Sequence, residues 1–266
     1  MIGLPWDKRL HDTTGRRGST GGGPPRRGRH GMVSTMRWRG SMVALLVAAT
    51  CTLLHPYSVP AGEIQGRIVL AGDVPPAKKI PITIDQYVCG TEQIASDLIV
   101  SSAREIRNVV VWLETPPAGA PSPPSPPAAA MDQKECVFVP RIVIVPTGGT
   151  VDFLNSDRLL HNLHSVSKDN ASFNRTQPKG RTIAITFAKP EFVRVDCDLH
   201  SWMRGWVVVA PHPFYALTDG QGRFKLDNVP PGPHVVRTWH ERLGETSQKV
   251  TVTDTATPLT IELRAR

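Results

Sequence analysis

The sequence predicts an all-β protein, because short strand-like runs and turn residues alternate along most of the chain. Ten runs rich in β-branched residues lie between residues 64 and 254, for example NVVVWLE (108–114) and GWVVVA (205–210). Turn clusters such as PTGG (146–149) and DGQG (219–222) separate them. Many short strands with regular turns are typical of β-sandwiches and barrels, and no stretch has the long 3.6-residue apolar period of a helix.

Composition divides the chain into five segments. We expect the following boundaries: a disordered leader and signal peptide (1–61), an N-terminal β segment (62–115), a Pro-rich linker (116–130), a β-sandwich (131–210) and a smaller β unit (211–266). The strand predicted at 64–72 could join either of the two β units.

The leader has the three parts of a secretion signal. Residues 1–35 are rich in Gly, Arg and Pro and are expected to be disordered. The basic segment MRWRG (36–40), the apolar run at 42–54 and Val-Pro-Ala at 59–61 then follow in the order of a signal peptide. The apolar run is short for a membrane span, although a retained anchor is the alternative. We therefore expect a periplasmic protein that starts near Gly62 and has no stable membrane insertion after cleavage.

The positive charge lies in the leader rather than in the body of the protein. The formal net charge is +8, but nine of the 31 Lys and Arg residues and two of the 23 acidic residues fall within 1–61. The remaining 22 basic and 21 acidic residues nearly balance. The body therefore lacks the basic surface that nucleic-acid binding requires.

The cysteine count points to one thiol with a separate role. Of the four cysteines, Cys51 lies in the predicted signal peptide, which leaves Cys89, Cys136 and Cys197 in the exported part. An odd number of cysteines in an oxidising compartment suggests that one of them is not paired. If Cys197 binds a metal, Cys89 and Cys136 form a disulfide; two buried thiols are the alternative.

A cluster of metal-ligand residues surrounds Cys197. His200 and Met203 follow it within CDLHSWM (197–203), between two predicted strands, and His161 follows the strand TVDFLN about forty residues upstream. One thiolate, two imidazoles and a thioether form the donor set of a type 1 copper site. His164 is an alternative ligand. Zinc is an alternative metal, but it prefers N, S and O donors to a thioether.

The spacing also suggests a role for each part of the site. Strand ends and a tight connection hold ligands rigidly, which limits rearrangement between redox states. We expect Asn162 to brace the loop around His161. His200 is expected on the exposed connection beside Trp202, with its imidazole edge open to a partner.

The sequence DCDLHSWMRGWVVVA, together with NSDRLLHNLHS, resembles the cupredoxins over about residues 135–210, and in particular amicyanin-like, plastocyanin-like and methylamine-utilisation-type bacterial proteins. The resemblance implies a Greek-key β-sandwich in which His161, Cys197, His200 and Met203 bind one copper ion. The family pattern has Pro at the position of Leu160, Ser or Thr at the position of Asp198, and Pro at the position of Ser201.

The C-terminal segment TDGQGRFKLDNVPPGPHVVRTWHERLG is similar to carboxypeptidase regulatory-like β-sandwich units. The sequence as a whole predicts a periplasmic blue-copper electron carrier with a transient redox protein partner, and not an enzyme. Two alternatives remain: a copper storage or delivery protein, and a structural or glycan-binding β-module with a degenerate metal site.

The predicted signal peptide can be tested by mass. Protein recovered from the periplasm should lack residues 1–61, because the basic segment, the short apolar run and the small-residue site together direct cleavage. Intact-mass spectrometry measures this, and a mass that includes residues 42–54 would indicate a membrane anchor instead.

Overall fold

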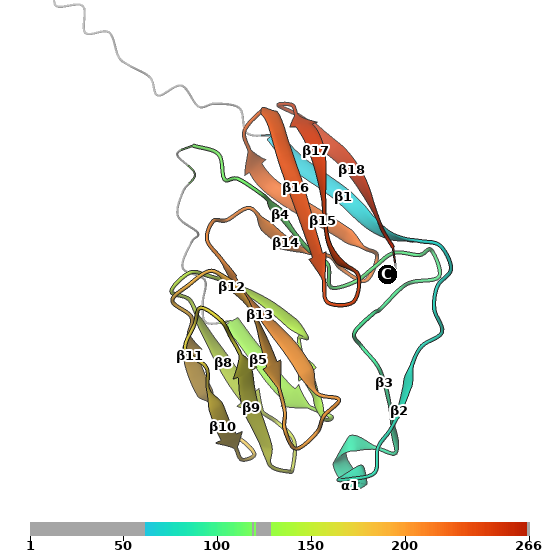
Figure 1. Cartoon of the computed structure of the whole chain (residues 1–266), viewed down its shortest axis with the longest axis vertical. Helices are drawn as coiled ribbons and strands as arrows, with labels where there is room; N and C mark the ends of the chain where they lie inside the picture. Colours follow the sequence, from blue (N-terminus) through green and yellow to red (C-terminus); the bar gives the residue numbers. More distant parts are fainter. Residues whose placement is uncertain (1–61, 119, 121–128, 265–266) are drawn as a thin grey trace, which may run out of the picture. The chain divides into compact units, whose positions relative to one another are not determined.

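The computed structural model describes residues 62–118, 120 and 129–264. The predicted signal peptide, Cys51 and most of the Pro-rich linker lie outside the described residues. Strands form nearly all of the regular structure (Figure 1). The predicted all-β class is thereby confirmed. Within these ranges no helix has the length and apolarity needed to cross a membrane.

One sandwich, here called the central sandwich, is formed by two sheets. The first has the strand order β10-β9-β12-β13-β7, and the second has the order β11-β8-β5-β6. The strands of the first sheet are β7 (Ile142–Pro146), β9 (His161–Val166), β10 (Asn174–Gln177), β12 (Glu191–Asp196) and β13 (Arg204–Ala210). Those of the second are β5 (Ala129–Lys134), β6 (Val137–Val139), β8 (Thr150–Asn155) and β11 (Ile183–Thr186).

The other sandwich, here called the terminal sandwich, combines strands from both ends of the described chain. Its sheets have the orders β15-β1-β18 and β14-β4-β16-β17. The strands are β1 (Gly62–Ala71), β4 (Val110–Leu113), β14 (Tyr215–Leu217), β15 (Arg223–Val229), β16 (Gly232–His240), β17 (Gly244–Val252) and β18 (Ala256–Arg264). Strand β1 pairs antiparallel with β15 and parallel with β18, so the strand predicted at 64–72 joins this unit.

Several strands differ from the sequence-based expectation, β5 and β9 among them. Strand β5 begins at Ala129, inside the range predicted as linker, because it pairs in parallel with β8 from Ala129 opposite Val151 onward. Strand β9 is not among the ten predicted runs, since HNLHSV contains several polar residues. In both cases pairing with neighbouring strands outweighs weak local strand propensity.

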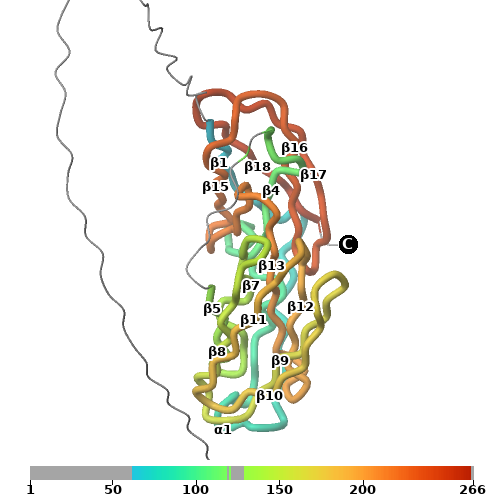
Figure 2. Tube along the Cα trace, turned by 90° about the vertical axis from the view of Figure 1, so that its left-hand side faces the viewer, coloured from blue at the N-terminus to red at the C-terminus, as the bar shows by residue number. Residues whose placement is uncertain are grey.

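A separate hairpin-like arm leaves the terminal sandwich after β1. This arm (residues 72–95) contains β2 (Lys79–Pro81), the short helix α1 (Gln86–Cys89) and β3 (Glu92–Ile94), and β2 and β3 pair antiparallel. Tyr87 of α1 lines one cavity together with Leu160 and Leu199 of the central sandwich, and Figure 2 shows α1 toward the same end of the trace as β10.

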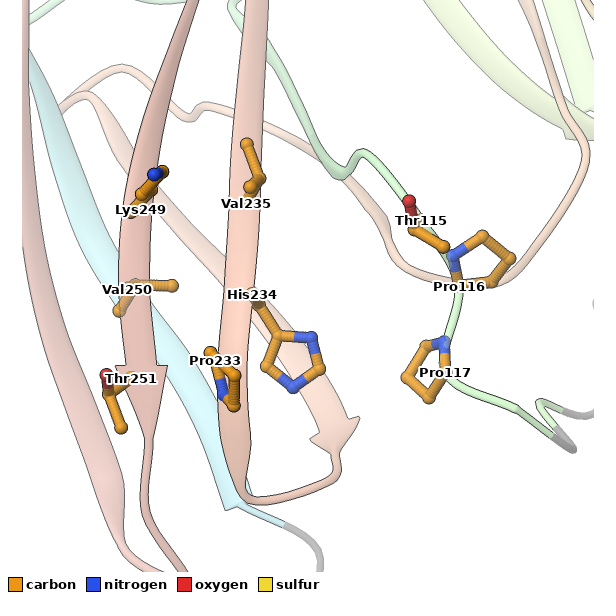
Figure 3. A pocket seen from close by; sticks show the side chains of 9 residues that line it. All are labelled: Thr115, Pro116, Pro117, Pro233, His234, Val235, Lys249, Val250 and Thr251. Carbon is orange, nitrogen blue, oxygen red and sulfur yellow. The ribbon is translucent and has the colours of Figure 1, made fainter.

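The terminal sandwich carries an open cavity of about 630 Å³ between β16, β17 and the segment that follows β4 (Figure 3). Pro116 and Pro117 line it from the segment after β4, and Pro233 lines it from β16 (Figure 3). His234 lies in the cavity wall, and its Nε2 contacts the carbonyl oxygen of Pro230 at 2.8 Å. Its nine lining residues include one imidazole, His234, and one amine, Lys249, and no thiol or carboxylate.

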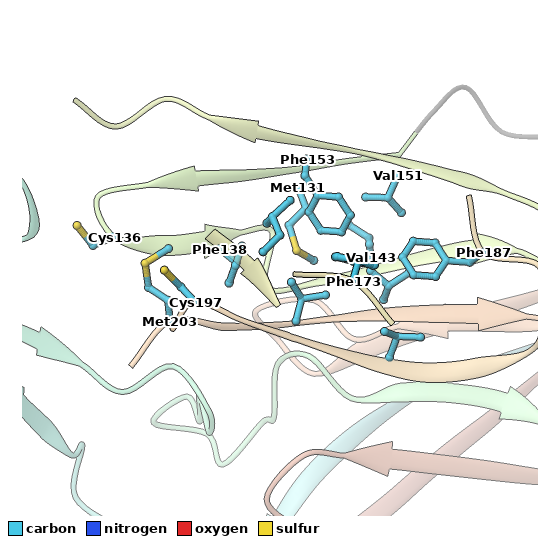
Figure 4. Packing of buried hydrophobic residues seen from close by; sticks show 14 of the residues in the cluster. Met131, Cys136, Phe138, Val143, Val151, Phe153, Phe173, Phe187, Cys197 and Met203 are labelled. Atoms are coloured by element: carbon cyan, nitrogen blue, oxygen red, sulfur yellow. The ribbon is translucent and has the colours of Figure 1, made fainter. Parts of the chain in front are cut away.

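The core of the central sandwich is filled from both sheets. Buried aromatic and branched side chains such as Phe153 from β8 and Val195 from β12 belong to one cluster (Figure 4). The same cluster contains Cys197 and Met203. The predicted thiol and thioether ligands therefore stand at one end of a close-packed core, which limits their movement.

The arm is attached to the central sandwich by a disulfide. Cys89 and Cys136 are bonded, which confirms the predicted pairing. Ile82 and Cys89 are both buried in the central core, and Gln93 Nε2 donates to the carbonyl oxygen of Glu135 at 3.0 Å. Covalent and apolar contacts thus hold the arm at this end of the sandwich.

Removal of the disulfide should lower stability markedly. It closes a loop of 47 positions, for which the chain-entropy model gives about 4 kcal/mol. The double variant Cys89→Ala/Cys136→Ala should lose roughly that amount of unfolding free energy in urea. Ala103→Ser, at an exposed position away from the disulfide, serves as the control and should unfold like the wild type. Equal unfolding midpoints for the double variant and the wild type would contradict the prediction.

Candidate metal centre

Three strong donor atoms meet at the end of the central core. His161 Nδ1 lies 3.1 Å from His200 Nδ1, and Cys197 Sγ lies 3.8 Å and 3.6 Å from these two atoms. All three side chains are buried, and together they form a group able to hold a metal ion. Of the predicted ligands, the fold therefore brings His161, Cys197 and His200 together.

The outward nitrogens of both imidazoles contact carboxylates. His161 Nε2 lies 2.8 Å from Asp157 Oδ2, and His200 Nε2 lies 3.0 Å from Asp85 Oδ2. A neutral imidazole has one N–H, and a carboxylate only accepts, so we assign the proton of each ring to Nε2. Both Nδ1 atoms then carry lone pairs that face one another.

This arrangement suits a cation. Two lone pairs 3.1 Å apart repel each other unless a positive charge lies between them. A circle through the two Nδ1 atoms and the Cys197 Sγ has a radius of about 2 Å, close to the roughly 2.0–2.3 Å of metal bonds to nitrogen and sulfur. The donor set and its spacing thus fit a first-row metal ion, and the thiolate favours soft copper.

Met203 approaches the same place through a tight connection. The Met203 N–H donates to the His200 carbonyl oxygen at 2.8 Å, and the Cys197 N–H donates to the Met203 carbonyl oxygen at 3.2 Å. Met203 is buried, and Figure 4 shows its side chain at the same end of the core as Cys197. These two backbone bonds hold the residues that carry the thiol and the thioether next to each other.

Burial has opposite effects on protonation at two of the donors. It raises the pKa of the Cys197 thiol, although backbone N–H groups of Asn162, His200 and Leu199 act in the other direction. Burial lowers the pKa of His161, whereas the hydrogen bond that its Nε2–H donates to Asp157 acts in the other direction. A neutral His161 is the form that offers a lone pair.

Asn162 joins the two segments that carry the donors, as the sequence predicted. Its Oδ1 accepts the backbone N–H of Asp198 at 2.6 Å, and its Nδ2 donates to Asp198 Oδ2 at 3.0 Å. His164, the alternative ligand, is half-exposed and contacts Asp198 Oδ1 at 2.8 Å. It therefore lies outside the donor group, and its hydrogen bond is the first cause of the lowered pKa of Asp198.

Asp157 is a residue of the site whose role the sequence did not indicate. Its carboxylate accepts the backbone N–H groups of Glu135 (2.7 Å) and Cys136 (2.9 Å) as well as the Nε2–H of His161. Glu135 and Cys136 both have positive φ angles, 55° and 57°, which is typical of a type I′ hairpin turn. Asp157 therefore links His161 to the β5–β6 turn. Its position four residues before His161 was the feature of the sequence that could have indicated this role.

His200 differs from the expectation. The sequence predicted an exposed imidazole edge, but the side chain is fully buried. Asp85 contacts it from the arm, 115 positions away in sequence, and the Trp202 ring packs edge-on against it with the ring centroids 5.2 Å apart. No pattern in the sequence connects Asp85 to His200, so this contact could not have been predicted.

A second group of potential ligands overlaps the first and consists of Cys136, Asp157 and His161. Cys136 is bonded to Cys89 and so has no thiolate to offer. Among the described residues, Cys197 is the cysteine with a free thiol. The group around Cys197 is therefore the candidate metal centre.

Parts of the chain are similar to solved structures of copper proteins. A Cu-containing nitrite reductase from Thermus scotoductus SA-01 matches at 23% identity over 36% of this chain, with a TM-score of 0.31, and the match spans 25% of the reductase. A purple cupredoxin from Nitrosopumilus maritimus matches at 22% identity, over 31% of this chain and 99% of its own, with a TM-score of 0.28. An oxidised proline-to-glycine mutant of amicyanin matches at 25% identity, over 36% of this chain and 97% of its own, with a TM-score of 0.30.

No protein-family model matches the chain, and no curated protein matches it. The similarity of residues 211–266 to carboxypeptidase regulatory-like units stays a prediction.

Asp157 should contribute to both stability and metal affinity. Asp157→Asn weakens three hydrogen bonds to a charged acceptor. The variant should lose about 2–3 kcal/mol of unfolding free energy in the metal-free protein. Its metal affinity should fall about tenfold or more. Chemical denaturation and competition with a chelator measure the two effects. Asp254→Asn, at an exposed position in the terminal sandwich, is the matched control. Equal behaviour of the two variants would contradict the assigned role.

Proposed function

We propose that this protein is a periplasmic type 1 copper protein that carries single electrons and is not an enzyme. The observation that supports this most strongly is the convergence of the Cys197 thiol and the two imidazole Nδ1 atoms, 3.1–3.8 Å apart, in a buried pocket. A trigonal Cys/His/His set with a weak axial Met suits both Cu(I) and Cu(II). The signal-peptide pattern of the leader supports export.

Each residue has a distinct part in this proposal. His161 and His200 would offer Nδ1 lone pairs, Cys197 the thiolate, and Met203 a soft thioether sulfur. A copper ion held by these residues would supply a one-electron redox couple. The protein keeps the donors in place during that change: His161 begins β9, Cys197 directly follows β12, and Met203 is fixed by backbone hydrogen bonds. Rigid donors reduce the rearrangement that accompanies electron transfer.

The surface beside the site supports a transient protein partner. Ile84, Tyr87, Leu160 and Leu199 are exposed apolar side chains, and they line one open cavity of about 650 Å³ together with Asp85 and Leu159. Small apolar contact areas suit redox encounters, which require rapid dissociation rather than high affinity. We propose that a redox protein meets the molecule at this surface.

Copper storage or delivery is a second candidate, and one observation favours it. All three strong donors are fully or almost fully buried, and Asp85 covers the ring that was expected to be open. Burial of this kind retains a metal well. Electron self-exchange between oxidised and reduced protein, measured by NMR line broadening, separates the two functions, because a carrier exchanges rapidly and a storage protein slowly.

Copper loading tests the proposed centre directly. The protein with Cu(II) should have an intense thiolate-to-copper absorption band at roughly 600 nm, and Cys197→Ser should abolish it. His164→Ala should keep the band, because the His164 ring contacts Asp198 and lies outside the donor group. If the wild-type protein bound copper without this band, the type 1 assignment would be wrong. If His164→Ala abolished the band, the ligand set would be wrong.

A further inference from the structure

The arm holds one acidic residue against the candidate metal centre. Its tip is fixed by the Cys89–Cys136 disulfide and by Ile82 in the central core. Asp85 lies in the connection between these two attachment points. Its position relative to His200 is therefore determined on both sides, by a covalent bond and by packing.

Asp85 has a backbone conformation that non-glycine residues rarely adopt. Its φ and ψ are 50° and 32°, in the left-handed region. It precedes α1, where an aspartate side chain commonly accepts backbone N–H groups, but here the side chain makes no capping hydrogen bond. The Val88 and Cys89 N–H groups donate to its backbone carbonyl instead. The carboxylate is thus left to contact His200 Nε2 at 3.0 Å.

We propose that Asp85 is a positioning residue for His200, which fixes the tautomer and orientation of the ring and lowers the reduction potential of the centre. This inference rests on the proposed copper function. It extends that function by adding a ligand-orienting residue from a separate segment, 115 positions away from the ligand in sequence.

The orienting effect follows from hydrogen bonding. A ring that donates Nε2–H to a carboxylate presents Nδ1 with its lone pair toward Cys197. Asp157 does the same for His161, so the two imidazoles have matching outer partners. Without Asp85, His200 could exchange between tautomers and rotate, and its side chain would be open to water.

The effect on potential follows from charge. A carboxylate on the outer nitrogen of a ligand raises the electron density of that ligand and stabilises the more positive Cu(II) state. Asp85 is about two-fifths exposed, so water screens part of this interaction. Removal of the charge should therefore shift the Cu(II)/Cu(I) equilibrium roughly three- to tenfold toward Cu(I), which is about 30–60 mV.

Three variants of the full exported chain separate charge from position. Asp85→Asn removes the charge but keeps an oxygen that can accept the Nε2–H, whereas Asp85→Ala removes both. Asp73→Asn removes the same charge at an exposed position of the same arm and is the matched control. The measurements are the reduction potential, the rate of copper release to a chelator, and the His200 tautomer in the metal-free protein by long-range ¹⁵N–¹H NMR.

We expect a raised potential for Asp85→Asn and Asp85→Ala and no change for Asp73→Asn. Copper release should be about 10–100-fold faster in Asp85→Ala and closer to the wild-type rate in Asp85→Asn. The wild-type His200 should be the Nε2–H tautomer, and Asp85→Ala should show both tautomers. If Asp85→Asn has the wild-type potential and Asp85→Ala keeps a single tautomer, Asp85 has a merely structural role and the inference is overturned.

The two proposals fail in different ways. Absence of the thiolate-to-copper band in the wild-type protein would remove the copper function, while the metal-free NMR measurement would still test the contact between Asp85 and His200. A normal band together with unchanged potential and tautomer in the Asp85 variants would remove this inference alone.

Discussion

Two imidazole rings turn their Nδ1 atoms toward each other at 3.1 Å and toward a buried sulfur, and much of the central sandwich serves to maintain this arrangement. Lone pairs at that distance repel, so the arrangement requires a rigid frame and becomes favourable with a cation between the donors. The carboxylates of Asp157 and Asp85 fix the protons on the outer nitrogens. The chemistry of the centre depends on these two outer contacts as much as on the donors themselves.

The frame consists of hydrogen bonds between segments that are distant in sequence. Asn162 bonds to Asp198 and so connects β9 to the connection after β12. Asp157 connects His161 to the β5–β6 turn, which belongs to the other sheet. Because both sheets are fastened to the donors, a movement of one ligand would disturb the packing of the whole core. A site of this kind suits a redox change that requires little rearrangement.

The arm changes the surroundings of the centre in a way that the donors alone do not indicate. It brings Asp85 over His200 and places Ile84 and Tyr87 at the surface beside Leu160 and Leu199. His200, which the sequence predicted to be exposed, is therefore buried and contacts a carboxylate of the same chain. A buried ligand is held more firmly. Its hydrogen bond to a neighbouring carboxylate, rather than exchange with water, determines which ring nitrogen carries the proton.

The sequence by itself predicted the all-β class, the residues that cluster at the candidate metal centre and the disulfide partners. Cys197, His200 and Met203 share one short connection, so their spacing reflects the local geometry of the candidate site, and the odd cysteine count left Cys89 and Cys136 as a pair. The alternation of apolar and polar residues likewise predicts strands from the local sequence alone.

Only the tertiary structure decided which segments meet. Strand β1 joins β15 and β18, and Asp85 meets His200 although 115 positions separate them. A single hydrogen bond between distant residues produces no periodicity or spacing in the sequence. The residues around Asp85 do not distinguish it from an ordinary aspartate in a turn. The burial of His200 is a consequence of chain folding that brings the arm to the metal centre, and it therefore became visible only in the folded molecule.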